Sequence, residues 1–256
     1  MLRLYLFGPL RVVSHGAPHR LRGLPKTQPL LAYLLLHRKQ PLKRDRLAYL
    51  FWPDATEETA RSNLRRHLHD LRKALPSSPP DAPWLIIEGE TVRWNPRSPY
   101  WLDVAEFERL SATPEGLAPA VTLYSEELLP EIYDDWIFFE RERLRDLLFV
   151  DLERLTSRYE ALGDTKRAIS YASQILQHDP LREETARLIM TLHYRAGDRN
   201  AALQEYRRIE RLLREELGVP PMPETVAAYE AISQGRSLPE IRRPQAAAAT
   251  SSRTTR

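Results

Sequence analysis

The chain has 256 residues, no cysteine, 29% charged residues and a formal net charge of +3. This is the composition of an ordinary globular protein, and the lack of cysteine excludes disulfides, thiolate metal sites and cysteine nucleophiles. The longest apolar run near the start, residues 30–36, is too short to span a bilayer and lacks the layout of a signal peptide, so we expect a cytoplasmic protein.

Charge is distributed unevenly along the chain. Residues 1–100 hold 17 Lys and Arg against 8 Asp and Glu, whereas residues 101–238 hold 17 against 26. A basic first part suits a polyanion such as nucleic acid, and an acidic second part does not. Many small basic domains never touch nucleic acid, so charge alone leaves the partner open.

The first elements are short strands and two helices. Alternating apolar residues over 2–24, interrupted by Gly8-Pro9 and by the turn-forming residues 14–18, predict a small antiparallel sheet. Helices are predicted over about residues 27–37 and 43–51, and Trp52-Pro53-Asp54 ends the second.

A third, basic helix is predicted over residues 57–75, with Thr56 as its N-cap. Its apolar residues recur at intervals of 4, 4, 3 and 4 and therefore share one face: Ala60, Leu64, Leu68, Leu71 and Leu75. The opposite face carries Ser62, Arg66, His69 and Lys73, flanked by Arg65 and Arg72. A helix of this kind fits the major groove of DNA.

A β-hairpin is predicted next, over residues 84–94, with its turn at Glu88-Gly89-Glu90. The order of strands, three helices and a hairpin is typical of a winged helix-turn-helix domain, in which the third helix enters the major groove.

Helical periodicity dominates the rest of the chain. Residues 139–162 predict one long helix with Leu144, Leu148, Leu152, Leu155 and Tyr159 on its inner face. Just before it lies an aromatic group, which we expect to be core: Tyr133, Trp136, Phe138 and Phe139. Asp134 and Asp135 suit helix capping better than metal binding, because no further ligands occur at a suitable spacing.

An internal repeat follows. The stretch Ala161-Leu-Gly-Asp-Thr-Lys-Arg-Ala-Ile169 matches Arg195-Ala-Gly-Asp-Arg-Asn-Ala-Ala-Leu203 at an offset of 34 residues. This is the period of tetratricopeptide helix pairs, with Gly-Asp as the turn. A pair of similar helical hairpins without a functional surface is the plainer interpretation.

In its motifs the chain resembles SARP-type bacterial transcriptional activators, which join an OmpR-like winged helix to a bacterial transcriptional activator domain. The stretches that carry the resemblance include Leu4-Tyr-Leu-Phe-Gly-Pro-Leu10, Arg44-Asp-Arg-Leu-Ala-Tyr-Leu-Phe-Trp-Pro-Asp54, Leu68-His-Asp-Leu-Arg-Lys-Ala-Leu75, Tyr124-Ser-Glu-Glu-Leu-Leu-Pro130 and Leu213-Arg-Glu-Glu-Leu-Gly-Val219. The wing departs from the family pattern, because it reads Thr91-Val-Arg-Trp-Asn95 and lacks the usual glycine-tyrosine ending. The resemblance implies binding to repeated promoter sites, with two subunits side by side as a homodimer on double-stranded DNA, and recruitment of RNA polymerase.

The expected fold is therefore mainly α. A winged helix-turn-helix (α+β) domain at residues 1–98 precedes an all-α, tetratricopeptide-like activator domain at 99–238, and residues 239–256 form a disordered tail. We predict DNA contacts from nine residues: Lys43, Arg44, Ser62, Asn63, Arg65, Arg66, His69, Lys73 and Arg93.

Two alternatives remain open. Arg65 and Arg72 suit solvated ion pairs with Asp70 or Glu58 as well as DNA contacts. The whole chain also suits a tetratricopeptide-type adaptor that docks a protein through its basic domain. Catalysis is not expected, and neither is a cofactor or a metal, because the sequence has no phosphate loop, no HExxH and no nucleophile elbow.

Overall fold

The computed structural model describes residues 1–237, which form two compact units, Met1–Asp151 and a second that begins at Leu152. Helix α6 (Asp135–Ala161) runs through this division. The domain boundary predicted after residue 98 falls within the first unit and stays a prediction. The predicted tail, residues 239–256, lies outside the described residues.

The first unit contains a four-stranded sheet in the order β3-β2-β1-β7. Its strands are β1 (Leu2–Tyr5), β2 (Arg11–Ser14), β3 (Ala17–His19) and β7 (Tyr100–Leu102). The first three pair antiparallel, which confirms the sheet predicted for residues 2–24, and β7 adds to β1 in a parallel pairing that was not predicted. A pairing between such distant parts of the chain leaves no local periodicity from which to predict it.

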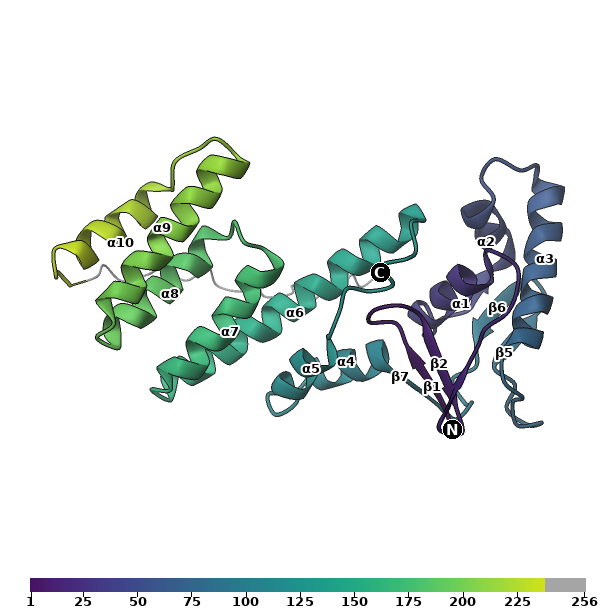
Figure 1. Cartoon of the computed structure of the whole chain (residues 1–256). Helices are drawn as coiled ribbons and strands as arrows, with labels where there is room; N and C mark the ends of the chain where they lie inside the picture. Colours follow the sequence, from purple (N-terminus) through teal and green to yellow (C-terminus); the bar gives the residue numbers. More distant parts are fainter. Residues whose placement is uncertain (238–256) are drawn as a thin grey trace, which may run out of the picture. The chain divides into compact units, whose positions relative to one another are not determined.

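Three helices and a hairpin gather at one end of this unit (Figure 1). They are α1 (Thr27–Leu36), α2 (Arg44–Phe51), α3 (Glu57–Ala74), β5 (Leu85–Glu88) and β6 (Thr91–Trp94). The predicted helices and hairpin are confirmed, with ends shifted by one or two residues. A short strand, β4 (Leu42–Lys43), adds to the hairpin in the order β4-β6-β5 and was not predicted.

Fully buried side chains hold this helical end together. Helix α3 packs against both α1 and α2. These elements contribute large side chains with at most 1% of their surface exposed, among them Leu30 and Leu34 of α1, Phe51 of α2, Leu64 of α3 and Trp94 of β6. Burial of each such side chain contributes about 1.5–3 kcal/mol, so the position of α3 is well determined.

A buried carboxylate joins the first sheet to helix α4 (Asp103–Ser111), which α5 (Leu117–Leu123) follows. One oxygen of Asp103 accepts hydrogen bonds from the amides of Leu6 at 2.7 Å and Phe7 at 2.9 Å. The other accepts from the amide of Val104 at 2.7 Å. Burial raises the pKa of Asp103 to about 6, against the opposing effect of these hydrogen bonds.

The aromatic group at the start of α6 is only partly core, which corrects the prediction. Trp136 is buried against Tyr33 and Phe51, but Tyr133, Phe138 and Phe139 are 79%, 54% and 78% exposed. Trp136 and the neighbouring Ile137 face the core, and the rotation of about 100° per residue carries positions 138 and 139 away from it.

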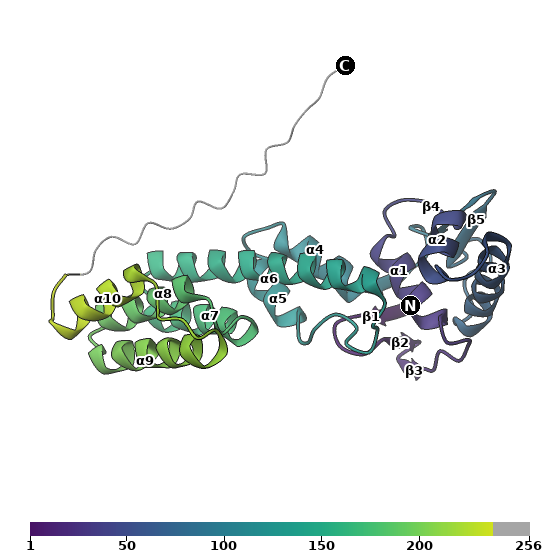
Figure 2. The ribbon, with the colours of Figure 1, turned by 90° about the horizontal axis from the view of Figure 1, so that it is seen from above.

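The second unit is helical throughout its described part and contains the predicted repeat. Its helices after α6 are α7 (Thr165–His178), α8 (Glu183–Arg195), α9 (Arg199–Glu216) and α10 (Pro223–Ser233). Helix α8 packs against both α7 and α9, as both views show (Figures 1 and 2). Across residues 1–237, every helix is too short or too polar to cross a bilayer.

The two halves of the repeat form equivalent turns. Gly163 and Gly197 both adopt positive φ, at +74° and +84°. The carboxylates of Asp164 and Asp198 then cap the following helices by accepting hydrogen bonds from the amides three residues later. The alanine four residues after each aspartate is fully buried, which allows close helix packing. The sequence-based prediction of paired helical hairpins is confirmed.

Candidate nucleic-acid interface

Local residues set the ends of helix α3. Thr56 has an extended conformation and caps the first turn, because its Oγ1 accepts a hydrogen bond from the amide of Thr59 at 3.4 Å. Glutamates occupy the first turn and basic residues the last, the order that the helix dipole favours. The predicted cap is confirmed.

One side of α3 is buried, as the spacing predicts. Its buried residues are Ala60, Leu64, His67, Leu68 and Leu71. His67 belongs to this side: its Nδ1 lies 2.8 Å from the carbonyl oxygen of Asn63, and its ring packs against Trp52 with centroids 4.8 Å apart. The helix is therefore fixed in rotation about its axis, and the opposite side faces solvent.

The outward side of α3, which we name the basic face, consists of Ser62, Arg65, Arg66, His69, Arg72 and Lys73, all exposed. Asn63 is half-buried at its edge. Within residues 1–237, four cations of this face form no salt bridge: Arg65, Arg66, Arg72 and Lys73. An exposed row of uncompensated positive charge attracts polyanions.

The alternative that Arg65 and Arg72 pair with Asp70 or Glu58 is wrong. The Asp70 carboxylate instead accepts hydrogen bonds from the amide of Leu24 and the hydroxyl of Thr27, both at 2.9 Å. These bonds hold the pKa of Asp70 below its usual value. In the described part of the chain, Glu58 makes no salt bridge.

Arg61 differs from the other arginines of α3, and the sequence did not single it out. Its guanidinium donates to both carboxylate oxygens of Asp45 on α2, at 2.8 and 3.0 Å. It also lies 2.7 Å from a carboxylate oxygen of Glu57. The hydrogen bonds to Arg61 lower the pKa of Asp45, and the charge of Arg61 is already compensated.

Lys43 and Arg44 lie where the start of α2 meets the hairpin. β4 places Lys43 opposite Thr91 of β6, and the amide of Arg44 donates to the Glu90 carbonyl at 2.8 Å. The guanidinium of Arg44 also donates to the carbonyl of Gly89 at 3.4 Å. Lys43 is exposed, whereas Arg44 is half-buried and partly engaged by the hairpin turn.

Arg93 lies on strand β6, away from the tip of the hairpin. It lines a cavity of about 780 Å³ together with Arg72 of α3 and Arg97. The exposed tip itself carries two acids, Glu88 and Glu90. The predicted contact of Arg93 with DNA stays a prediction, and the structure groups this residue with Arg72 at the end of the basic face.

The structure thus brings five of the nine predicted residues together on one exposed surface: Ser62, Arg65, Arg66, His69 and Lys73. Lys43, Arg44 and Arg93 lie on neighbouring elements, and Asn63 is half-buried. The predicted set omitted one cation of this surface, Arg72 at the end of the basic face. The spacing of Arg72 placed it beside the face, but the approach of the hairpin to it had no sequence signal.

Comparison with known proteins identifies the family. The model of the bacterial transcriptional activator domain matches residues 102–233, which is more than half of the chain. The transcriptional regulatory protein MoaR1 of Mycobacterium tuberculosis is 27% identical over 253 residues, covering 91% of this chain and 79% of MoaR1. The regulatory protein AfsR of Streptomyces griseus is 28% identical, covering 95% of this chain but only 25% of AfsR.

A solved structure has the same fold. The structure of Mycobacterium tuberculosis EmbR in complex with a low affinity phosphopeptide superimposes with a TM-score of 0.69 and 22% identity, covering 93% of this chain and 66% of EmbR. The architecture is thus mainly helical, with a small sheet region in its first part, as predicted. The chain belongs to the bacterial transcriptional activator domain family and is a transcriptional regulator of the SARP type.

Proposed function

We propose that this regulator is a sequence-specific DNA-binding activator whose helix α3 enters the major groove of promoter DNA. The observation that carries the proposal is the basic face, where four cations without salt bridges in residues 1–237 lie opposite a fully packed side. A helix of this diameter fits the major groove, which is about 12 Å wide. Arginine is also the side chain that most often reads guanine, through two parallel hydrogen bonds.

Each predicted residue has a role that follows from its place. Arg65 and Arg66 lie mid-helix, where base edges are reached, and Asn63 and His69 add further base contacts. Other groups surround this centre and suit phosphates: Ser62, Lys73, Lys43 and Arg44. Arg93, beside Arg72, contacts the minor groove or its phosphates from the hairpin.

The whole activity extends beyond DNA binding. Regulatory relatives and the activator domain support a protein that acts at promoters. We propose that two copies lie side by side on repeated sites and that the helical part recruits RNA polymerase. The competing adaptor function predicts binding to a protein and none to a defined duplex.

The test begins with selection of bound sequences from random duplexes, followed by fluorescence anisotropy with the selected duplex. Arg66→Ala should weaken binding by about 1–3 kcal/mol and relax preference at one base position if Arg66 reads a base. If it holds a phosphate, the loss should be uniform across sequences, with a shallower salt dependence.

The matched control is Arg211→Ala, an exposed arginine on helix α9 of the second unit. This substitution removes the same charge from a surface without a proposed DNA contact. The affinity of the variant for the selected duplex should therefore equal that of the parent protein. Equal affinities for Arg66→Ala and the parent, or no selected sequence at all, would contradict the proposal and favour the adaptor.

A further inference from the structure

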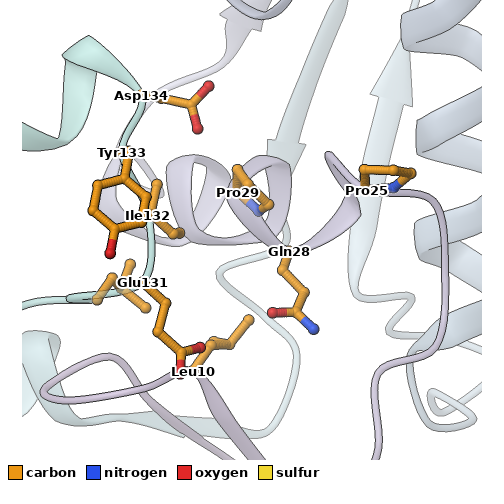
Figure 3. A pocket seen from close by; sticks show the side chains of 9 residues that line it. Leu10, Pro25, Gln28, Pro29, Glu131, Ile132, Tyr133 and Asp134 are labelled. Carbon is orange, nitrogen blue, oxygen red and sulfur yellow. The ribbon is translucent and has the colours of Figure 1, made fainter.

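A cavity in the first unit lies outside the basic face and has a distinct chemistry. Its volume is about 440 Å³, and three separate segments line it: the loop after β1, the start of α1 and the segment before α6. Figure 3 shows its lining residues, which are Leu10, Pro25, Gln28, Pro29, Leu129, Glu131, Ile132, Tyr133 and Asp134. Nothing in the proposed contact with DNA uses this cavity.

The wall formed by residues 128–132 is held rigidly. Arg141 of α6 donates to the carbonyl oxygens of Leu128, Leu129 and Ile132, at 2.8, 2.5 and 3.0 Å. Leu129 adopts a left-handed conformation, with φ +46°, and its amide donates to the Leu6 carbonyl at 3.0 Å. A backbone fixed in an unfavourable conformation by several hydrogen bonds is a preformed wall, which reduces the cost of binding.

The charge of the cavity is negative. Glu131 is exposed and, within the described residues, forms no salt bridge. Figure 3 shows its carboxylate and the amide of Gln28 reaching toward Leu10 from opposite walls. Asp134 forms an ion pair with Lys26, whose Nζ lies 3.9 Å from its carboxylate, so the uncompensated charge among the lining residues is that of Glu131. None of the nine lining residues is basic.

These features favour a planar cation. The aliphatic and proline side chains supply flat apolar surface, and the exposed ring of Tyr133 stands at the edge. A guanidinium group stacks on the face of a tyrosine ring such as that of Tyr133, is more weakly hydrated than an ammonium group and can donate in parallel to a carboxylate and an amide oxygen. The ammonium group of lysine is more strongly hydrated and lacks the planar shape.

We propose that this cavity binds the side chain of an arginine presented by a protein partner. Free arginine carries a carboxylate, for which no lining residue offers a cationic partner. An arginine within a chain has no such charge. Helix α6, which follows the lining segment in the chain, also exposes Phe138 and Phe139, and aromatic residues and arginine are both enriched at protein interfaces.

The first experiment follows amide resonances of the full chain by NMR during titration with N-acetyl-arginine N-methylamide. Saturable shifts confined to the cavity lining are expected, and the citrulline analogue, which is neutral and of the same shape, should bind at least about tenfold more weakly. Free L-arginine should also bind more weakly. Equal binding of citrulline overturns the proposal, and tighter binding of free arginine assigns the cavity to a small molecule instead.

Two variants test the residues. Glu131→Gln should lower the affinity about tenfold or more, because it removes the free carboxylate. Glu115→Gln is the matched control, since Glu115 is exposed in the same unit but does not line the cavity. Tyr133→Ala should weaken binding severalfold without loss of stability, because its side chain is 79% exposed. Unchanged affinity in both cavity variants overturns the proposal.

The second experiment addresses the protein partner. Selection of displayed peptides on the full chain should enrich arginine-containing sequences that Glu131→Gln no longer retains. Enriched peptides without arginine overturn the proposal, and so does dimerisation of the chain that depends on Glu131, because a second copy is then the occupant. Arg66→Ala should leave every one of these measurements unchanged, so failure of DNA binding and failure of this inference are separable.

Discussion

The arginines of α3 differ in whether they already form salt bridges within the protein, and this difference is testable. Arg61 is engaged by Asp45 and Glu57, so a phosphate would have to displace two carboxylates to reach it. Arg66 has no salt bridge in residues 1–237. Arg61→Ala should therefore reduce affinity for the selected duplex less than about threefold, and Arg66→Ala about tenfold or more. Anisotropy titrations of both variants at one salt concentration make the comparison. Equal losses would show that DNA displaces the carboxylates of Asp45 and Glu57 from Arg61.

Asp103 predicts a pH dependence of stability. Its pKa in the folded chain is raised from 3.8 to about 6 by burial, so the folded state holds this proton more tightly than the unfolded state. The resulting stabilisation is complete below about pH 3 and is lost as the pH rises through 6. At 1.36 kcal/mol per pKa unit the loss is about 3 kcal/mol between pH 3 and pH 7.

Asp103→Asn removes this titration and keeps the shape of the side chain. The difference in free energy of unfolding, variant minus parent, should therefore rise by about 3 kcal/mol from pH 3 to pH 7. Urea unfolding of both proteins at several pH values measures it. Because all other groups are common to both, a difference that stays constant with pH would mean that Asp103 ionises normally in the folded chain.

At the scale of elements, the two repeat turns should respond alike to the same change. Gly163 and Gly197 share a positive φ, and no neighbouring atom lies within 4 Å of a Cβ built at either position. The cost of alanine there is thus backbone strain alone, about 1–2 kcal/mol for each substitution. Asparagine tolerates this conformation better and should cost less than alanine at both positions. Urea unfolding of the four single variants checks the equivalence, and a cost at only one turn would argue against it.

Elements with strong local periodicity were predictable from the sequence, because the spacing of their apolar residues shows which side of the element is buried. The stripe of leucines and the Thr56 cap define α3, and the matching Gly-Asp turns define the helix pairs of the second unit. The parallel pairing of β7 with β1 was not predictable, since it depends on how distant segments meet. Strand β4, with only two residues, is too short to show a period.

The candidate site divides in the same way. The rotation of α3 gave the exposed residues of the basic face, because helical spacing alone determines which side is buried. The clamp of Asp45 on Arg61 and the grouping of Arg93 with Arg72 depend on packing between elements. The prediction that all the aromatic residues before and within α6 are core was wrong for three of the four. Composition alone does not say which of several adjacent aromatic side chains faces inward.

At the scale of the whole molecule, the net charge of +3 conceals opposite charges in the two parts of the chain. If DNA contacts only the basic part, the slope of log affinity against log salt should depend on the number of cations that contact phosphates there. It should not depend on the acidic residues elsewhere in the chain. Three cationic phosphate contacts, from Lys43, Arg44 and Lys73, predict a slope of about −2.7 for log affinity against log salt. Affinity should then fall about 20-fold between 100 and 300 mM salt.

Two variants separate local contacts from net charge. Lys73→Ala should make the slope shallower by about one unit, because it removes one phosphate contact. Glu215→Gln combined with Glu216→Gln raises the net charge of the chain by two, at exposed positions near the end of α9. Their slope should equal that of the parent, since these residues touch no DNA in the proposed complex. A slope that follows net charge instead would mean that the chain binds DNA as a diffuse polycation, and α3 would lose its special role.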